Sequence, residues 1–454
     1  MVDASILAAL RTAKTVFNEN KTLTLISHVG DRVWAGKVYF AEADGYIYVA
    51  LEKGRNYRNI KENPHVFFVI EHGVPDRFIQ GEGVAEELGP IEERPERHIL
   101  FRKVFELVPF AKAFPGVTVF RIRPTRLFIS DFTGVWKPRT EIEVTDEVLR
   151  IFRERYPTRT PRWKKYLQAV RPFSFTATAI PVLLGALLAP RVHGGLLFLT
   201  LLGALALHAG VNVISDYFDY RRGADTWRVL GSSRVLVDQI MAPRPLFRWG
   251  ILLFVLGCSI GLYLVYLRGL PILWIGMIGA ALGMFYTAPP LGLKYRALGD
   301  VAVFIAFGPL MALGAFYVQT QTLDPRVAYL AVPIGLLTIA ILHGNNYRDI
   351  QEDLQAGYRT VAVLLGPRGS GIYYLCLVAF AYGLTVWFVM RGWFPVGCLL
   401  VVLTLPVAWR NVRIAFQPAR VAFTFLDLLT AQLHLYFGLA LVIGLVLAQW
   451  HIAG

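Results

Sequence analysis

The chain has 454 residues, of which 55% are hydrophobic, and its 46 Lys and Arg outnumber 32 Asp and Glu. Such hydrophobicity excludes an ordinary soluble protein, although the length would suit two or three soluble domains. The basic excess requires no nucleic-acid partner, because Lys and Arg also collect in the cytoplasmic loops of membrane proteins. The three cysteines lie in apolar segments without CxxC or Cys/His spacing, which argues against zinc and disulfide bonds.

Residues 1–135 alternate between polar and apolar side chains in the manner of β-strands. The alternating segments, separated by turn sequences, are 22–28, 32–40, 46–51, 65–70, 76–87 and 117–131. Six strands of this length predict a small closed β barrel, with short helices at the start, around 55–62 and around 91–107. The chain opens without a basic and then apolar leader, so we expect this domain to remain in the cytoplasm.

Residues 136–165 are charged and contain prolines. This composition predicts a linker between two domains, with one helix near 144–155. The stretch Arg162-Trp-Lys-Lys165 at its end is basic and contains a tryptophan, which is typical of a segment at a membrane surface.

Residues 166–454 contain about nine apolar segments, most of them roughly long enough to cross a bilayer. These segments are 173–190, 196–218, 249–267, 271–289, 298–319, 327–346, 371–390, 394–409 and 424–449. They predict an all-α, polytopic membrane domain of about nine transmembrane helices. The whole chain is therefore expected to be multidomain.

The connections between these segments predict the orientation of the membrane domain. One set of connections is rich in arginine, whereas the other offers only Arg191, Arg268, Arg326 and Arg391. By the positive-inside rule the arginine-rich set is cytoplasmic, on the same side as the N-terminal domain. An odd number of spans would then place Gly454 outside the cytoplasm, in a multi-pass protein of the inner (plasma) membrane.

Two acidic stretches stand at the ends of apolar segments. In the first, Asn212, Asp216, Asp219 and Gly223 have the spacing of one helix face, as do Asn346, Asp349 and Asp353 in the second. Carboxylates beside a membrane span are costly unless they are paired or bind a cation. Mg²⁺ takes oxygen ligands from one or two carboxylates together with substrate phosphates. The pattern predicts a diphosphate site more strongly than it predicts solvated aspartates paired with nearby arginines.

These stretches resemble the signature motifs of the UbiA superfamily of intramembrane aromatic prenyltransferases. Further sequences resemble the branch that prenylates 1,4-dihydroxy-2-naphthoate in menaquinone synthesis: Gly231–Val237, Tyr286–Arg296, Gly299-Asp300, Phe307–Leu310 and Gly357–Thr360. The resemblance covers roughly residues 165–450 and implies nine helices around a central cavity that opens toward lipid. Tyr358 departs from the motif, because this branch commonly has Lys at that position.

The residues then have expected roles in transferring a polyprenyl group to an aromatic acceptor. We expect Mg²⁺ ions, held by the catalytic residues, to neutralise the departing diphosphate; these ligands are Asp216, Asp219, Asp349 and Asp353. The residues expected to bind substrate are Asn212, Arg234, Lys294, Asn346, Arg348 and Tyr286. For the nearby His208 and His343 we favour structural roles in the core over general-base catalysis.

The N-terminal domain resembles the FMN-binding split barrels of the pyridoxamine-phosphate-oxidase-like group. The resemblance lies in Arg55–Pro64 and Gln80–Ala85 and covers roughly residues 5–135. It implies FMN as a candidate cofactor and a dimer formed through the barrel. Lys37, Lys53 and Arg55 are the candidate cofactor contacts, although a solvated basic face would explain them almost as well. A barrel that has lost its cofactor and only regulates or docks is the alternative.

Other functions remain open from the sequence alone. Within the same superfamily the acceptor could be 4-hydroxybenzoate, homogentisate, a haem or a glycerol-phosphate lipid. A different class of function is an ion-coupled membrane transporter without enzymatic activity. Transporters usually contain paired repeats with broken helices, and we detect no such repeat in the sequence.

Overall fold

The computed structural model describes residues 4–72, 74–133, 139–157 and 162–453. The chain divides into two compact units. The barrel unit comprises Met1–Pro161 with Asp238–Ile240, and the helical unit comprises Arg162–Val237 with Met241–Gly454.

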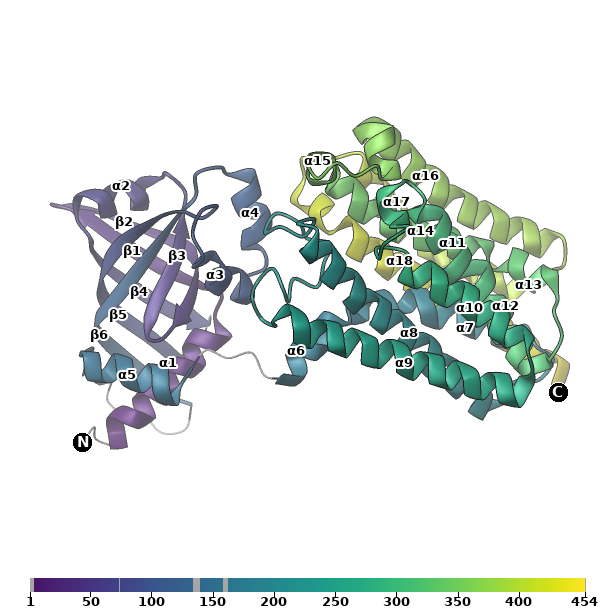
Figure 1. The fold of residues 1–454 in the computed structure, drawn as a ribbon. Helices are drawn as coiled ribbons and strands as arrows, with labels where there is room; N and C mark the ends of the chain where they lie inside the picture. The colour runs from purple at the N-terminus through teal and green to yellow at the C-terminus, as the bar shows by residue number, and fades with distance from the viewer. Residues whose placement is uncertain (1–3, 73, 134–138, 158–161, 454) are drawn as a thin grey trace. The chain divides into compact units, whose positions relative to one another are not determined.

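The barrel unit is built on one antiparallel sheet (Figure 1). Its strands are β1 (Thr22–Val29), β2 (Arg32–Ala43), β3 (Tyr46–Leu51), β4 (His65–His72), β5 (Val74–Pro90), β6 (Thr118–Asp131) and β7 (Thr140–Glu143). The strand order is β3-β2-β1-β4-β5-β6-β7, and pairing of β3 with β6 closes the barrel. Residues on β1 alternate between buried and partly exposed positions, as the period of a strand requires. The predicted closed barrel is confirmed.

Five helices complete the barrel unit. They are α1 (Ala4–Glu19), α2 (Arg55–Glu62), α3 (Arg97–Lys103), α4 (Leu107–Ala113) and α5 (Asp146–Arg155). Thr145 caps α5 by accepting a hydrogen bond from the Val148 amide at 3.4 Å. Leu149 and Phe152 of α5 are buried in the same core as Phe17 and Phe40.

The segment that the sequence predicts to be a linker is therefore partly built into the barrel. Its expected helix is present as α5, and Ile142 of β7 also reaches the barrel core. The physical reason is the amphipathic pattern of α5, which gives this charged segment one apolar face to bury. Residues 136–138 and 158–161 of the predicted linker lie outside the described residues.

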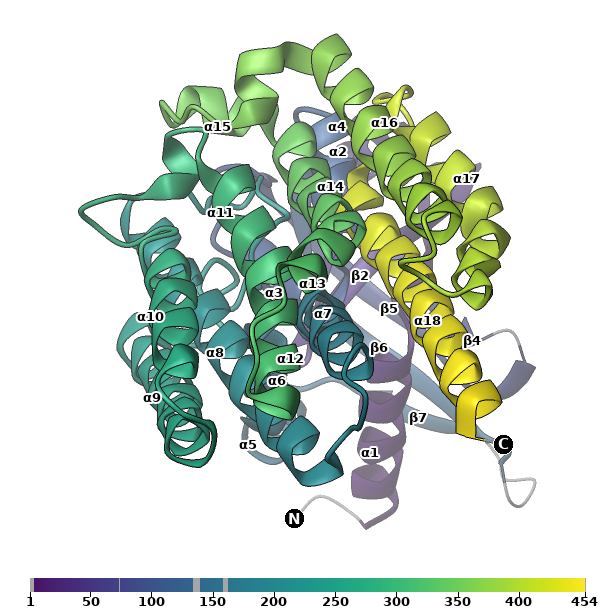
Figure 2. The same ribbon diagram turned by 90° about the vertical axis from the view of Figure 1, so that its right-hand side faces the viewer.

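The helical unit is a bundle of long apolar helices (Figure 2). In its first half lie α6 (Arg162–Ala169), η1 (Pro172–Phe175), α7 (Thr176–Leu187), α8 (Gly194–Arg221), α9 (Pro243–Arg268), α10 (Pro271–Met284), η2 (Leu293–Tyr295), α11 (Gly299–Ile305), η3 (Ala306–Leu310) and α12 (Met311–Thr320). In its second half lie α13 (Pro325–Leu330), α14 (Val332–Arg348), α15 (Ile350–Gln355), α16 (Val361–Met390), η4 (Val396–Thr404), α17 (Leu405–Ala415), η5 (Val421–Phe425) and α18 (Leu426–Ala453).

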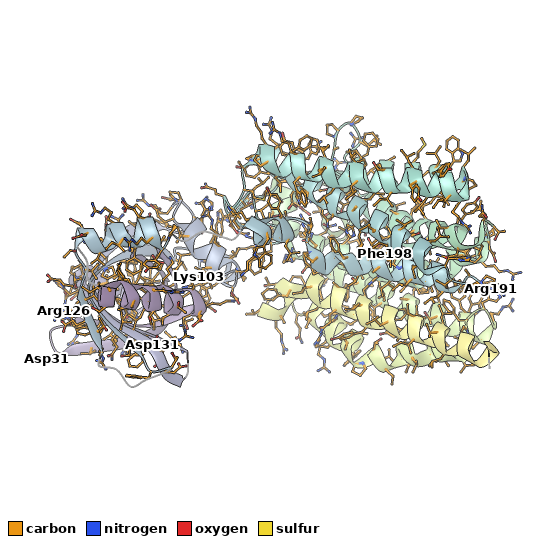
Figure 3. All side chains as sticks on the ribbon, turned by 90° about the horizontal axis from the view of Figure 1, so that it is seen from below. Asp31, Lys103, Arg126, Asp131, Arg191 and Phe198 are labelled. Atoms are coloured by element: carbon orange, nitrogen blue, oxygen red, sulfur yellow. The ribbon has the colours of Figure 1, made fainter. Side chains whose placement is uncertain are left out.

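Among the described residues, 7 helices are long and apolar enough to cross a membrane, or up to 8 with the bent pair that contains α6 and α7. The shorter apolar helix α10 lies where the remaining span is predicted. This agrees with the prediction of about nine spans, and the protein is a multi-pass membrane protein. Large apolar side chains such as Phe198 on α8 are exposed on the outside of the bundle, which suits contact with lipid (Figure 3).

Two features of the bundle position the site. Helix α14 is the most buried of the candidate spans and packs against α11, α16 and α18. The bend of 49° between α6 and the helix that follows occurs at Arg171, whose φ is 53°. Pro172 disfavours the right-handed helical conformation for the residue before it, which explains why the helix breaks there.

Candidate active site

One cavity of the helical unit, with a volume of about 180 Å³, is lined by residues from both acidic stretches. The residues predicted for the site that line this cavity are Asn212, Asp219, Tyr286, Lys294, Asn346, Asp349 and Asp353. They come from the end of α8, the connection after α10, and the α14–α15 region. The fold thus brings the two stretches to the same cavity, although 126 residues separate Asn345 from Asp219 in the sequence.

Helical periodicity places the carboxylates only in part. Helix α8 continues to Arg221, so Asn212 and Asp219 lie on one face of it, as the spacing predicts. In the second stretch α14 ends before Asp349, whose φ of −99° and ψ of 18° interrupt the helix. The amide of Asp353 still donates to the carbonyl of Asp349 at 2.9 Å, so both carboxylates reach the cavity.

Asp219 is held by two groups from the connection between α10 and α11. The Lys294 amine donates to one carboxylate oxygen at 2.8 Å, and the Tyr295 hydroxyl donates to the other. The Tyr295 ring lies against the Tyr358 ring, with 4.4 Å between centroids. The backbone carbonyl of Tyr295 accepts from the Arg359 amide at 3.2 Å. These contacts connect the α10–α11 connection with the loop after α15.

Asp225 also lines the cavity, and the predicted site does not include it. Gly223 has a φ of 73°, and the amides of Ala224 and Asp225 donate back to the Asp219 carbonyl at 2.9 and 3.4 Å. The chain therefore turns after α8 and returns the Asp225 carboxylate toward Asp219. Burial and the neighbouring Asp219 carboxylate raise the pKa of Asp225 above its ordinary value. Spacing on a helix face could not identify Asp225, because it lies beyond the end of the helix.

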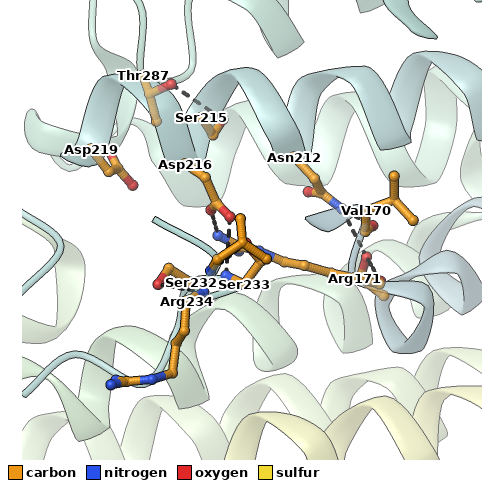
Figure 4. Close-up of polar contacts among 12 residues, drawn as sticks. Val170, Arg171, Asn212, Ser215, Asp216, Asp219, Ser232, Ser233, Arg234 and Thr287 are labelled. Atoms are coloured by element: carbon orange, nitrogen blue, oxygen red, sulfur yellow. Dashed lines mark hydrogen bonds and ion pairs between the residues drawn. The ribbon is translucent and has the colours of Figure 1, made fainter. Parts of the chain in front are cut away.

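Asp216 occupies a different environment (Figure 4). Its carboxylate accepts from the Arg171 guanidinium and, at 3.0 Å, from the Ser233 amide. Asp216 is 2% exposed and is not among the cavity-lining residues, whereas Arg171 lines the cavity. The Nε of Arg171 is buried without a hydrogen-bond partner among the described residues. The sequence offers no signal for Arg171 beyond its position before Pro172.

Arg348 acts behind the cavity wall and is not one of the lining residues. Its guanidinium donates to both oxygens of Asp349 at 3.0 and 2.9 Å and lies 3.0 Å from an oxygen of Asp427. Both of these carboxylates line the cavity, so Arg348 fixes their positions. Sequence reasoning missed Asp427, although a single carboxylate at the start of the last apolar segment is the signal that could have identified it.

Arg234, another predicted substrate contact, is buried and organises the loop between α8 and α9. It donates to the carbonyls of Trp227 and Val229 at 3.1 and 2.7 Å, and its side chain extends away from Asp216 in Figure 4. Gly231 of this loop lines the cavity at a close approach to α14. A Cβ atom at Gly231 would stand 2.1 Å from Oδ1 of Asn345, so any larger residue at this position would have to displace the Asn345 side chain.

The carboxylates that line the cavity suit a divalent cation by their chemistry. No group of three or more His, Cys, Asp or Glu in the described parts of the chain is close enough to form a complete metal site. The lining nevertheless contains Asp219, Asp225, Asp349, Asp353 and Asp427 against two cations, Arg171 and Lys294. Burial raises the pKa of Asp353 to about 6, and a bound cation would favour its ionised form. Oxygen ligands in this number fit Mg²⁺ that arrives with phosphate oxygens.

The two histidines near the acidic stretches are held in the protein interior. His208 Nδ1 lies 2.7 Å from the Thr178 hydroxyl and Nε2 lies 3.3 Å from the Ser174 hydroxyl. Nε2 of His343 lies 3.1 Å from the Ser370 carbonyl. All three contacts agree with structural roles in the core.

The candidate cofactor contacts of the barrel, Lys37, Lys53 and Arg55, are exposed. Arg55 stacks over the Trp34 ring at 4.5 Å. Lys103, labelled in Figure 3, is a partly buried basic residue that the sequence did not single out; its amine is buried and lies 3.4 Å from the Phe40 ring centroid. Burial lowers the pKa of Lys103 to about 7, even though Glu42 opposes this shift.

Comparison with known proteins follows the same division of the chain. Residues 178–429 match the UbiA prenyltransferase family. The chain is 38% identical to UbiA prenyltransferase domain-containing protein 1 of Rattus norvegicus over 303 residues, which are 65% of this chain and 88% of the relative.

Two solved structures resemble parts of the chain. The apo structure of a UbiA homolog from Aeropyrum pernix K1 covers 60% of this chain and 97% of that chain, at 18% identity and a TM-score of 0.48. A heme-binding protein from Mycobacterium smegmatis covers 33% of this chain and 62% of that chain, at 17% identity and a TM-score of 0.28. The family match spans more than half of the chain, and the chain therefore belongs to the UbiA prenyltransferase family.

Proposed function

We propose that the helical unit transfers a polyprenyl group from a polyprenyl diphosphate to an aromatic acceptor, with 1,4-dihydroxy-2-naphthoate as the acceptor in menaquinone biosynthesis. One observation carries this proposal. A single cavity joins the carboxylates of both acidic stretches to two cations and also to apolar side chains such as Val211, Ile341 and Phe307. A substrate with an anionic head and an isoprenoid chain matches both parts of such a cavity.

The basic residues of the cavity suit the diphosphate. Lys294 and Arg171 both line it, and the buried Nε of Arg171 has a hydrogen atom to donate. Phosphate oxygens would accept from these groups in charge-assisted hydrogen bonds. In the protein described here the same cations neutralise Asp219 and Asp216, so binding of the head group would redistribute these contacts.

The carboxylates would hold the metal ions. We assign Mg²⁺ to Asp219, Asp225, Asp349 and Asp353, which all line the cavity. Asp216, expected to be a ligand from its spacing, would instead orient Arg171. When bound, Mg²⁺ supplies Lewis-acid neutralisation of the diphosphate charge that develops as the allylic C–O bond breaks. Arg348 would keep Asp349 in place during this step, because its guanidinium contacts both carboxylate oxygens.

The remaining lining would protect the allylic cation. Tyr286 and Phe307 offer aromatic faces, which attract cations, and the apolar side chains around them exclude water. The carbon of the electron-rich acceptor ring that bears the carboxyl group can then attack the allylic cation with no stronger activation than correct positioning, and the ring regains aromaticity as this carboxylate leaves as CO2. Neither His208 nor His343 is needed as a base, because both are engaged with neighbouring groups.

The acceptor is the part of the proposal that needs a direct test. The rivals are 4-hydroxybenzoate, homogentisate, a haem and a glycerol-phosphate lipid. The experiment is a competition assay on the purified chain, with one polyprenyl diphosphate, Mg²⁺ and all acceptors together. We expect 1,4-dihydroxy-2-naphthoate to be prenylated fastest. Faster prenylation of any rival would assign the chain to another branch of its family, and no prenylation of any acceptor would contradict the proposed reaction.

We also propose an inner (plasma) membrane location, with the barrel unit in the cytoplasm. The support is the arginine-poor set of connections, which includes Arg191 between α7 and α8 and Arg391 after α16. Gly454, which is expected outside the cytoplasm, lies outside the described residues. Accessibility of tags placed before Met1 and after Gly454 in intact cells tests this orientation, and two tags on the same side would refute it.

FMN remains our proposal for the barrel unit, with Lys37, Lys53 and Arg55 as phosphate contacts and a dimer as the assembly. Their exposure leaves all three side chains accessible to a ligand. Flavin absorbance of the purified chain measures this directly. A substitution of Arg55 by Gln should reduce flavin content, whereas a barrel that copurifies with no flavin and binds none on addition would be a docking or regulatory domain.

A further inference from the structure

Tyr358 is the position at which the sequence departs from the motif that it otherwise resembles, because a tyrosine stands where that branch commonly has Lys. The proposed reaction gives this residue no role. Tyr358 lines the cavity that holds the carboxylates, and it is half-buried although the three residues before it are exposed. The contacts of its backbone and of its ring show what a tyrosine does at this position.

The backbone of Tyr358 is tied to a carboxylate of the second acidic stretch. After α15 the chain turns at Gly357, whose φ is 76°, and the Tyr358 amide donates to the Asp353 carbonyl at 2.8 Å. Two residues later, the Thr360 hydroxyl donates to the Asp353 carboxylate at 3.3 Å. The loop therefore wraps around Asp353, which is one of the carboxylates assigned to Mg²⁺.

The ring of Tyr358 reaches toward the first acidic stretch. It lies 4.4 Å from the Tyr295 ring, centroid to centroid, and the Tyr295 hydroxyl donates to the Asp219 carboxylate. The backbones of the two loops also meet, through a parallel bridge between Arg296 and Arg359. Tyr358 thus supports the ring whose hydroxyl orients Asp219, a second carboxylate assigned to Mg²⁺.

The Tyr295 ring has a cation as its other neighbour. The Arg222 guanidinium, just after the end of α8, lies 4.7 Å from the centroid of this ring. Gly292 leaves room for the contact, since a Cβ atom there would stand 2.9 Å from the Tyr295 ring and 3.3 Å from Nη1 of Arg222. The Lys294 amine lies 5.9 Å from the same centroid. A lysine at position 358 would add another cation beside this ring, whereas tyrosine packs on it without repulsion.

We propose that Tyr358 is a positioning residue that couples the two acidic stretches. Through the Tyr295 ring it holds Asp219 in the orientation in which Asp219 and Asp353 bind Mg²⁺ together with one diphosphate. This inference rests on the proposed function, because it assumes a metal-bound diphosphate in the cavity. Tyr358 acts through its ring and not through its hydroxyl, so phenylalanine should replace it, whereas alanine and lysine should not.

The test measures binding, so that it does not depend on turnover. Radiolabelled inorganic pyrophosphate stands in for the head group of the donor, and equilibrium dialysis of the purified full-length chain gives the Mg²⁺ concentration for half-maximal binding. We expect Tyr358→Ala and Tyr358→Lys to raise this concentration roughly fivefold, as the loss of one aromatic pair predicts, and Tyr358→Phe to keep it within about twofold. Leu354→Ala is the matched control, because Leu354 is exposed on α15 and does not line the cavity.

A double variant tests the path through Tyr295. Tyr295→Phe should raise the same Mg²⁺ concentration, and adding Tyr358→Ala should raise it little further, because both changes act on Asp219 along one path. Additive effects of the two changes would overturn the proposal. The same holds if Tyr358→Phe is as damaging as Tyr358→Ala, which would assign the hydroxyl to the ligand, or if Tyr358→Ala changes nothing. If Tyr358→Ala does not fold, Tyr358→Leu takes its place.

The same measurements separate this inference from the proposed function. If pyrophosphate binding responds to Tyr358 as expected but no acceptor is prenylated, the proposed function fails and the role of Tyr358 stands. If prenylation proceeds and the Mg²⁺ dependence of Tyr358→Ala is unchanged, only the role of Tyr358 fails. Absence of pyrophosphate binding at every Mg²⁺ concentration would refute both.

Discussion

The two acidic stretches of the helical unit have the same two kinds of carboxylate: one paired with an arginine and one that accepts from a side-chain hydroxyl. Each stretch has one aspartate tied to arginine: Asp216 to Arg171, and Asp349 to Arg348. Each also has a carboxylate that lines the cavity and accepts a hydrogen bond from a side-chain hydroxyl. Ser232 serves Asp225 in this way, and Thr360 donates to Asp353 at 3.3 Å.

The stretches differ in what their arginine does. Arg348 holds a carboxylate that lines the cavity, whereas Arg171 holds one that does not and itself lines the cavity. The first stretch therefore contributes a cation to the site through its buried pair, and the second contributes an anion. This difference indicates that one Asp–Arg pair serves diphosphate binding and the other serves metal binding, and the variants below separate these roles.

The largest effect is expected at the Asp216–Arg171 pair. Asp216→Asn breaks the buried ion pair with Arg171, and the loss of such a pair should cost up to about 3–5 kcal/mol of stability. The measurement is thermal unfolding in detergent, where Tm should fall. The double variant with Arg171→Gln should recover part of that loss, because both charges are then gone. A single variant with unchanged Tm would show that the pair has no structural role.

The carboxylates without an arginine partner should affect turnover instead of stability. Asp225→Asn and Asp353→Asn are each expected to lower kcat/KM by about a hundredfold or more, the order of loss seen when an electrostatic group of an active site is removed. Tm should stay near that of the unmodified chain. Glu352→Gln is the matched control, because it changes the carboxylate next to Asp353 that does not line the cavity. Near-normal turnover of Asp225→Asn would remove Asp225 from the metal site.

Much of the fold follows from local patterns in the sequence. Six alternating segments correspond to β1–β6, and the predicted apolar segments correspond to the helices of the bundle. The ends of α8 and α14 could be recognised because carboxylates beside an apolar helix are unusual. The sequence patterns that gave correct predictions are those in which apolar side chains repeat with the period of a β-strand or of an α-helix.

The parts of the site that could not be predicted depend on contacts between distant segments. Nothing near Asp216 in the sequence shows that Arg171, 45 residues earlier, neutralises it. Asp225 was not predicted as a site residue, because a turn at Gly223, and not a helix face, directs it to the cavity. Arg234 and Arg348 have the charge expected of phosphate ligands. In the structure, however, Arg234 donates to loop carbonyls and Arg348 donates to a carboxylate.

A smaller loss of activity is expected at Lys294, which contacts Asp219 at 2.8 Å and lines the cavity. Lys294→Met removes a cation proposed to bind the diphosphate, and kcat/KM should fall roughly tenfold or more, mostly through KM of the donor. Lys294→Arg keeps the charge and should restore part of the affinity. A fall of kcat with unchanged KM would indicate that Lys294 acts only in the transition state, and unchanged kinetics would exclude it from the site.

The smallest expected effects concern the hydroxyl groups that hold the cavity carboxylates, and they distinguish the two stretches once more. Tyr295→Phe removes the hydroxyl that donates to Asp219 but keeps the ring that lies 4.4 Å from Tyr358. One lost hydrogen bond of about 1 kcal/mol should lower kcat/KM roughly fivefold with little change in Tm.

Thr360→Val should lower both kcat/KM and Tm, because the Thr360 hydroxyl also accepts from the Val363 amide at 3.3 Å and caps α16. Tyr436→Phe on the exposed side of α18 is the control for loss of a tyrosine hydroxyl. If Tyr295→Phe lowers Tm as much as Thr360→Val does, the Tyr295 hydroxyl stabilises the fold instead of orienting Asp219 for metal binding.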